Sequence, residues 1–236
     1  MKHSENSQIQ DFMPLVANVL QKGLQALSDG QSTYSADPIE QYAYSVFSRV
    51  SEIDNAFKGI EITIEYLKKG CYSESDFSFA EHHAFHVENY LLRLTSVVDR
   101  AYLLAGSSLF MSDEKIEAWD GKKLITSKLK LESADSLKVL NKMNRQIDAL
   151  KKTRNKVAHQ AGYSNKNLCA VEFIENSESP EIYEELTRHL SLQELKEIII
   201  SDVLPNFESV AKLLHELVEE LIGCLSFVYH DLLART

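Results

Sequence analysis

The stretch KKTRNKVAHQ, residues 151–160, brings Arg154, Asn155 and His159 close together in the chain. An arginine keeps its positive charge and presents a planar fork of N–H donors that fits phosphate oxygens. A histidine gains and loses a proton near neutral pH, which suits general acid–base catalysis. Asn155 lies one helical turn before His159 and can hydrogen-bond to its imidazole. These residue types indicate a site for an anionic ligand beside a proton-transfer group.

Arg154 occupies a position where the preceding helical pattern requires an apolar side chain. The apolar residues of this segment recur every three or four positions, at Leu137, Leu140, Met143, Ile147 and Leu150. This spacing predicts one helix from about Ala134 to His159. The same stripe continues through Arg154 to Val157. Because an unpaired buried charge costs several kcal/mol, Arg154 must reach an acidic partner, water in a cleft or the anion of a ligand.

The relation between Arg154 and His159 depends on where this helix ends. Side chains five residues apart diverge by roughly 140° on an ideal helix. The two groups converge if the helix ends near Ala158, which Gly162 allows. They also meet if a second copy of the chain contributes one of them across a two-fold axis.

Three capping boxes mark the beginnings of other helices. In each of them an Asp or Ser precedes a Glu by three residues, at Asp37–Glu40, Ser78–Glu81 and Ser191–Glu194. Apolar residues at helical spacing follow each box. We therefore expect long helices that end near Gly70 and Gly106, and a short helix through about Val203. Pro205 is expected to separate that short helix from a last one.

The segment after the Arg154 helix has a different pattern. Its sequence NLCAVEFIEN, residues 167–176, alternates apolar and polar residues and contains β-branched ones. This pattern indicates a short strand or β-hairpin. Residues 1–36 are expected to form one short helix and a flexible connector, and residues 37–236 a single helical domain. The predicted fold class is all-α, a bundle of four or five main helices with the hairpin as an insertion.

The composition excludes several classes of protein. Hydrophobic residues make up 44% and charged residues 25%, as in a globular protein, and only 8 Gly and 4 Pro occur. The N-terminus does not read as a signal peptide, and no stretch approaches the roughly 18 apolar residues of a membrane span. The three cysteines are far apart and form no CxxC pair. We therefore expect a reduced, cytoplasmic protein without a membrane partner.

The net charge of −10 hides a basic segment. Between Lys122 and Lys156, eleven basic residues stand against three acidic ones, which gives a local charge of +8. Such a run forms either a solvated helix face or a phosphate-binding surface on an acidic body. Both interpretations remain open at this point.

Arg154, Asn155 and His159, late in a helix of the predicted bundle, resemble the R-x(4–6)-H motif of the HEPN superfamily. These are helical nucleotide-binding domains of higher eukaryotes and prokaryotes. In that family the arginine is commonly followed by Asn, Asp or His, and Asn155 fits this pattern. The resemblance covers roughly residues 37–236 and implies a HEPN-like bundle.

The resemblance implies a metal-independent endoribonuclease with a toxin–antitoxin or defence role. Arg154 is then assigned to the phosphate, His159 to proton transfer as the 2′-hydroxyl attacks, and Asn155 to the orientation of either. The implied partners are RNA, a second copy that completes a composite site, and an antitoxin or regulatory protein. No cofactor is implied. Some toxins of the superfamily carry a modified tyrosine two residues after the histidine, but Ala161 stands there and makes this control doubtful.

Further basic side chains are candidates for RNA contacts. Lys151, Lys152 and Lys156 flank Arg154. The helix that begins at Ser78 also carries a polar line formed by His82, His86, Asn89, Arg93, Ser96 and Arg100. This line is either the solvent side of the helix, or it places Arg93 and Arg100 in the cleft of Arg154, with Glu88 and Asp99 as acidic partners.

Two alternatives to a nuclease stay open. A non-catalytic module that binds RNA or nucleotides would keep the fold and the phosphate contacts. A helical protein-interaction module, whose long amphipathic faces pair with a partner, is the other. The basic helix end itself also has a purely structural explanation, because its side chains satisfy the terminal carbonyls and the helix dipole. His82 and His86 lie one turn apart but lack a third ligand nearby, so we expect no metal site.

Overall fold

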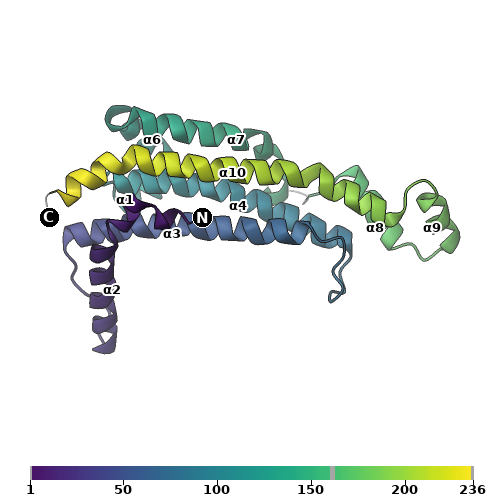
Figure 1. Ribbon diagram of the computed structural model, residues 1–236, viewed down its shortest axis with the longest axis horizontal. Coiled ribbons are helices and arrows are strands. Elements are labelled where there is room, and N and C mark those ends of the chain that lie inside the picture. The colour runs from purple at the N-terminus through teal and green to yellow at the C-terminus, as the bar shows by residue number, and fades with distance from the viewer. Residues whose placement is uncertain (1, 160–162, 235–236) are drawn as a thin grey trace. The chain divides into compact units, whose positions relative to one another are not determined.

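The computed structural model describes residues 2–159 and 163–234, except for the side chains of Lys152, Lys156, Ala158 and His159. The described residues form helices and no β-strand, which confirms the predicted all-α class. Four helices are long, as Figure 1 shows: α3 (Pro38–Leu67), α4 (Phe79–Ser108), α7 (Ala134–His159) and α10 (Leu192–Leu233). The shorter helices are η1 (His3–Glu5), α1 (Ser7–Gln10), α2 (Met13–Ser28), α5 (Asp113–Ile116), α6 (Gly121–Glu132), α8 (Lys166–Glu175) and α9 (Pro180–Thr187).

The three predicted capping boxes form and set the beginnings of α3, α4 and α10. At α4 the backbone N–H of Ser78 donates to the Glu81 carboxylate at 2.8 Å, and the Glu81 N–H donates to the Ser78 hydroxyl at 3.2 Å. Equivalent bonds join Ser191 to Glu194. These bonds satisfy backbone N–H groups that the helix itself leaves without an acceptor.

The expected β-hairpin after α7 is wrong, because residues 166–175 form helix α8. Leu168, Val171 and Ile174 are its buried residues, and their spacing of three is helical. The side chain of Asn165 caps the helix by accepting the Leu168 N–H at 2.7 Å. The apparent alternation in the sequence is therefore overridden by a cap and by burial of one helical face.

The expected break at Pro205 is also wrong, because Pro205 lies inside the continuous helix α10. Proline removes one intrahelical hydrogen bond and crowds the preceding turn. Ile199 before it and Phe207 after it are both buried. Tertiary packing on both sides of Pro205 therefore offsets the local cost and keeps the helix intact.

The chain forms two compact units. Unit 1 comprises Met1–Ala56, Ser96–Arg145 and Leu214–Thr236, and unit 2 comprises Phe57–Thr95 and Gln146–Leu213. Each of the four long helices contributes one part to each unit. The expected division into residues 1–36 and 37–236 stays a prediction.

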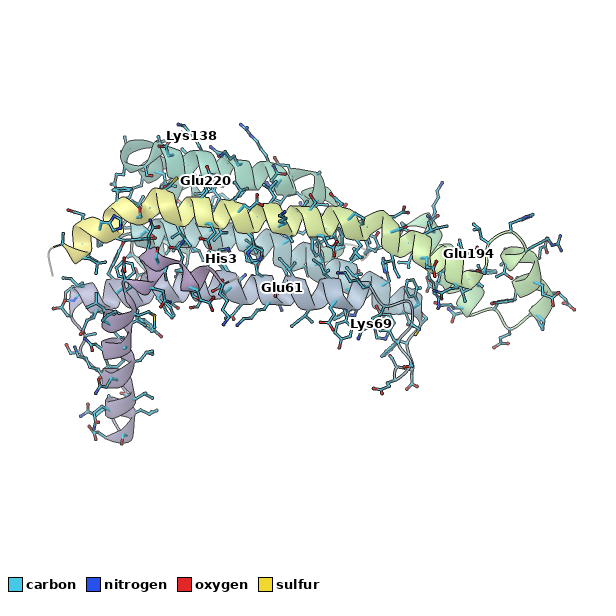
Figure 2. All side chains as sticks on the ribbon, viewed as in Figure 1. His3, Glu61, Lys69, Lys138, Glu194 and Glu220 are labelled. Carbon is cyan, nitrogen blue, oxygen red and sulfur yellow. The ribbon has the colours of Figure 1, made fainter. Side chains whose placement is uncertain are left out.

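Aromatic side chains with satisfied hydroxyls hold unit 1 together. The hydroxyl of Tyr42 donates to the Ser108 carbonyl at 2.8 Å, and the hydroxyls of Ser108 and Tyr229 lie 2.8 Å apart. Phe12 packs edge-on against both tyrosines. At the N-terminus, His3 lies between α3 and α10 (Figure 2) and its ring contacts Asp54 of α3 at 2.9 Å. These contacts tie the first residues of the chain to the helices of unit 1.

Unit 2 has a separate core that joins α4, α8 and α10. Tyr90 of α4 stacks on Phe207 with a centroid distance of 3.8 Å, and its hydroxyl donates to the Phe207 carbonyl at 2.8 Å. A second cluster of buried residues consists of Phe79, Ala80, Leu168, Val171 and Ile199.

Across the described ranges, no helix has the length and apolar character that a bilayer crossing requires.

His83 of α4 is fully buried in unit 2 and lacks a hydrogen-bond partner at either ring nitrogen. It packs face to face with Phe79 at 5.4 Å. Burial, with a smaller contribution from His86, lowers the pKa of His83 from 6.5 to about 4. Because unfolded His83 then binds more protons than folded His83 between these values, the free energy of unfolding falls as the pH drops through that window.

Replacing His83 with phenylalanine should remove this pH dependence. The His83→Phe substitution changes the free energy of unfolding at each pH. We expect this change to be more favourable at pH 5 than at pH 8 by about 1–2 kcal/mol. Urea denaturation at both pH values measures this difference. The matched control is His189→Phe, since His189 is exposed and should show no such gain. An equal effect at both pH values would contradict the assignment.

Candidate functional site

The packing of α7 determines the position of Arg154. The helix has the predicted bounds, Ala134–His159, and buries Leu140, Met143 and Ile147. The stripe continues into unit 2 with Leu150, Arg154 and Val157, all half-buried. Arg154 thus lies on the packed side of its helix, as the sequence predicted.

The Arg154 guanidinium is incompletely satisfied. Its Nε is buried and has no hydrogen-bond partner. Its Nη1 donates to the Asn155 side-chain oxygen at 3.1 Å. No acidic side chain in the described part of the chain forms an ion pair with it. A buried donor without an acceptor costs about 1–3 kcal/mol, and the charge of the guanidinium is left without an acidic partner among the described residues.

Asn155 is exposed and contacts the arginine directly. Asn155 is the residue expected to orient either Arg154 or His159. Its side-chain oxygen accepts the bond from Arg154 and holds the guanidinium on that side. The hydrogen bond expected between Asn155 and the His159 imidazole stays a prediction.

The remaining motif residues lie partly outside the described structure. The backbone of His159 ends α7, but the side chains of His159, Lys152 and Lys156 are outside the described residues. Because α7 continues through position 159, positions 154 and 159 lie roughly 140° apart around the helix axis. This spacing increases the need for a second chain if both groups act on one phosphate.

A contact that sequence reasoning missed fixes the chain after the motif. The Tyr163 backbone N–H donates to the Glu88 carboxylate of α4. The Tyr163 hydroxyl accepts a bond from Asn165 at 3.0 Å, and Tyr163 packs against the second cluster of unit 2. The expected pairing of Glu88 and Asp99 with the arginines of α4 is therefore not found, since Asp99 pairs with Lys122 at 2.5 Å.

The two candidate arginines of α4 belong to different units. Arg93 is exposed in unit 2, the unit of Arg154, and its Nε lies 3.4 Å from the Asn89 side-chain oxygen. Arg100 belongs to unit 1 and donates to Ser96. His86 is only 9% exposed, so the polar line is not a solvent face along its whole length.

The basic segment is partly neutralised by acidic side chains. Lys151 pairs with Asp148 at 2.6 Å, within one turn of α7. Lys142 of α7 pairs with Glu220 of α10 at 2.8 Å, and Figure 2 shows Lys138 and Glu220 on these helices. Further pairs within the segment are Lys128–Glu132 and Lys138–Asp135. Arg154 differs from these lysines because no such acid compensates its charge among the described residues.

The described residues contain no group of three or more His, Cys, Asp or Glu side chains that could hold a metal ion. His82 and His86 are instead stacked with tyrosine rings. The three cysteines are free thiols.

Comparison with known proteins gives one family match. The model of the HEPN_Cthe2314-like HEPN family matches residues 31–221, which is most of the chain. No curated protein matches the sequence. No solved structure matches it either.

Removing the Arg154 charge should not destabilise the protein. We expect Arg154→Met to leave the free energy of unfolding unchanged or to raise it by up to about 1 kcal/mol, because no folded-state ion pair is lost. The matched control is Arg49→Met. Arg49 is nearly buried and pairs with Asp113 at 2.9 Å and Glu117 at 2.6 Å, so its removal should reduce stability. Urea denaturation measures both, and a larger loss for Arg154→Met would indicate an internal ion pair instead.

Proposed function

This chain belongs to the HEPN_Cthe2314-like HEPN family, and we propose that it is a metal-independent endoribonuclease of the HEPN type. Family membership supports an RNA-related role at the level of the superfamily. The observation that carries the proposal is the half-buried Arg154 guanidinium, which forms no ion pair with an acidic side chain among the described residues. A fixed cation without an acid partner is what a developing negative charge on a phosphate requires.

The proposed reaction uses the RNA as its own nucleophile. The 2′-oxygen attacks the adjacent phosphorus, the P–O2′ bond forms and the P–O5′ bond breaks. His159 accepts the proton of the 2′-hydroxyl or donates one to the leaving 5′-oxygen. Arg154 neutralises the charge on the non-bridging oxygens, and Asn155 orients its fork. The products are a 2′,3′-cyclic phosphate and a 5′-hydroxyl end.

RNA cleavage in the presence of EDTA tests this proposal. We expect cleavage products with cyclic phosphate ends, and a loss of at least about 100-fold in rate for Arg154→Gln and for His159→Gln, since each removes a transition-state contact. Arg145→Gln is the matched control, because Arg145 is an exposed arginine on the same helix. Gel analysis of end-labelled RNA measures the rate. Equal cleavage by all variants would assign the activity to a contaminant or to another site.

We propose that the active form is a homodimer with a composite site. Positions 154 and 159 diverge around the axis of α7, so one phosphate is reached most directly by an arginine from one chain and a histidine from the other. A toxin or defence role, restrained by an antitoxin or regulatory protein, agrees with the family resemblance. Lys151, Lys152, Lys156, Arg93 and Arg100 are then the proposed contacts to the RNA backbone.

Mixing two inactive variants tests the composite site. Co-expression of Arg154→Gln and His159→Gln chains should restore part of the activity, because a mixed dimer retains one arginine and one histidine in a shared cleft. The same variants expressed alone serve as controls. RNA cleavage by the purified mixed dimer is the measurement. Absence of recovery in a verified mixed dimer would place both groups in one chain.

A helical interaction module is the second candidate, favoured by one observation. Leu20, Leu24 and Leu27 of α2 are exposed and spaced as one helical stripe. Figure 1 shows α2 extending away from its neighbours in unit 1. Binding of a protein partner without RNA cleavage would favour this function, whereas salt-dependent RNA binding without product would indicate a non-catalytic RNA-binding module.

A further inference from the structure

The C-terminal end of α3, the loop after it and the first turns of α4 form a pocket lined by rings. The pocket has a volume of about 490 Å³ and is lined by Tyr66, Phe77, Glu81, His82, Phe85 and His86. All these residues belong to unit 2. Cavities of this size, predominantly apolar with a few polar groups, are typical of small-ligand sites.

Two stacks of rings build the wall of the pocket. Tyr72 and His82 stack at 3.9 Å with an interplanar angle of 15°, and Tyr66 and His86 stack at 4.9 Å. The Tyr72 hydroxyl donates to the Tyr66 carbonyl at 2.8 Å, which ties the loop to α3. The His82 ring bonds to the hydroxyl of Ser75 at 2.7 Å. The wall is therefore held in place without a ligand.

Two phenylalanines of the pocket remain open to solvent. Phe77 is 66% exposed and packs edge-on against His82, and Phe85 is 60% exposed and packs edge-on against His86. Large exposed aromatic surfaces beside a cavity mark interaction sites. Their π-faces carry partial negative charge, which attracts cations.

The fixed charge among the lining residues of the pocket is negative. Glu81 is the one acidic residue among the lining residues. Hydrogen bonds from Ser78 lower the pKa of the Glu81 carboxyl, so it is ionised. Burial lowers the pKa of His86, which keeps that ring neutral at pH 7. Lys69 lies just after α3 (Figure 2), and its ammonium is 4.0 Å from the Tyr66 ring centroid. Tyr66 is thus already engaged by this cation and by the His86 ring, so Phe77, Phe85 and Glu81 are the groups left for a ligand.

We propose that this pocket binds an alkylated ammonium group, through the exposed rings of Phe77 and Phe85 and the carboxylate of Glu81. A quaternary ammonium group is a weakly hydrated cation. Aromatic rings with a nearby carboxylate suit it, because the π-faces and the carboxylate both attract its positive charge. The same carboxylate repels the phosphate of a nucleotide. This site shares no lining residue with the Arg154 site, and its occupant does not depend on the ribonuclease proposal.

Calorimetric titration of the full chain with matched probes tests the proposal. Choline carries a trimethylammonium head, and 3,3-dimethyl-1-butanol is its neutral isostere. We expect choline to bind at least about fivefold more tightly than the alcohol, since the cation–π contribution is of the order of 1 kcal/mol or more. A peptide with trimethyllysine carries the same head. Tighter binding of that peptide than of choline identifies a protein partner, and the reverse identifies a free small molecule.

Variants of the pocket separate the rings from the charge. Phe85→Ala should weaken choline binding by about fivefold or more, and Glu81→Gln by about threefold, since glutamine keeps the capping box but not the charge. The matched control is Phe173→Ala, because Phe173 is an equally exposed phenylalanine of unit 2 outside the pocket. Thermal unfolding confirms that each variant folds, and Phe77→Ala replaces Phe85→Ala if the latter does not.

Three results would overturn the proposal. Equal affinity for choline and the alcohol would show a purely apolar pocket. Tighter binding of AMP than of choline would identify a base-stacking site. Absence of choline binding at millimolar concentrations, in protein that melts cooperatively, would show that the pocket takes no such ligand. None of these results changes the expectation for RNA cleavage, which the Arg154 and His159 variants test separately.

Discussion

The apolar stripe of α7 fixes the rotation of that helix, and everything proposed for Arg154 depends on this rotation. Leu140, Met143 and Ile147 are fully packed, so turning the helix to expose Arg154 would expose them as well. Burying each of these side chains contributes about 1.5–3 kcal/mol. Together they outweigh the cost of one guanidinium N–H donor that has no acceptor. Packing therefore holds a cation in a place that electrostatics alone would not choose.

Much of the fold could be predicted because its signals are local. The boxes at Asp37–Glu40, Ser78–Glu81 and Ser191–Glu194 depend on residues three positions apart, and all of them form. The errors arose where distant residues decide the outcome. Pro205 stays helical because Phe207 is stacked on Tyr90, more than one hundred positions earlier in the chain. Residues 166–175 are helical because an Asn165 cap and burial of one face outweigh their β-branched content.

The position of Arg154 in the candidate site was also predictable, because it too depends on a local signal. Helical spacing alone places Arg154 on the packed side of α7. It does not reveal that Glu88 is taken by the Tyr163 backbone or that Asp99 is taken by Lys122. It also cannot show that His86 is buried against tyrosine rings. Which acid neutralises which base is decided by contacts between helices, and a single sequence carries no direct signal of these contacts.

Unit 2 combines two places of opposite chemical preference. Arg154 carries a permanent positive charge without an ion-pair partner among the described residues, which suits an anion with oxygens that accept hydrogen bonds. The ring pocket offers π-faces and the carboxylate of Glu81, so an anion is disfavoured there and a weakly hydrated cation is favoured. Bare phosphate would be rejected by the pocket, and an alkylated ammonium by Arg154. The charges that let each place hold its own ligand also exclude the ligand of the other, so both could be occupied in the same molecule without competition.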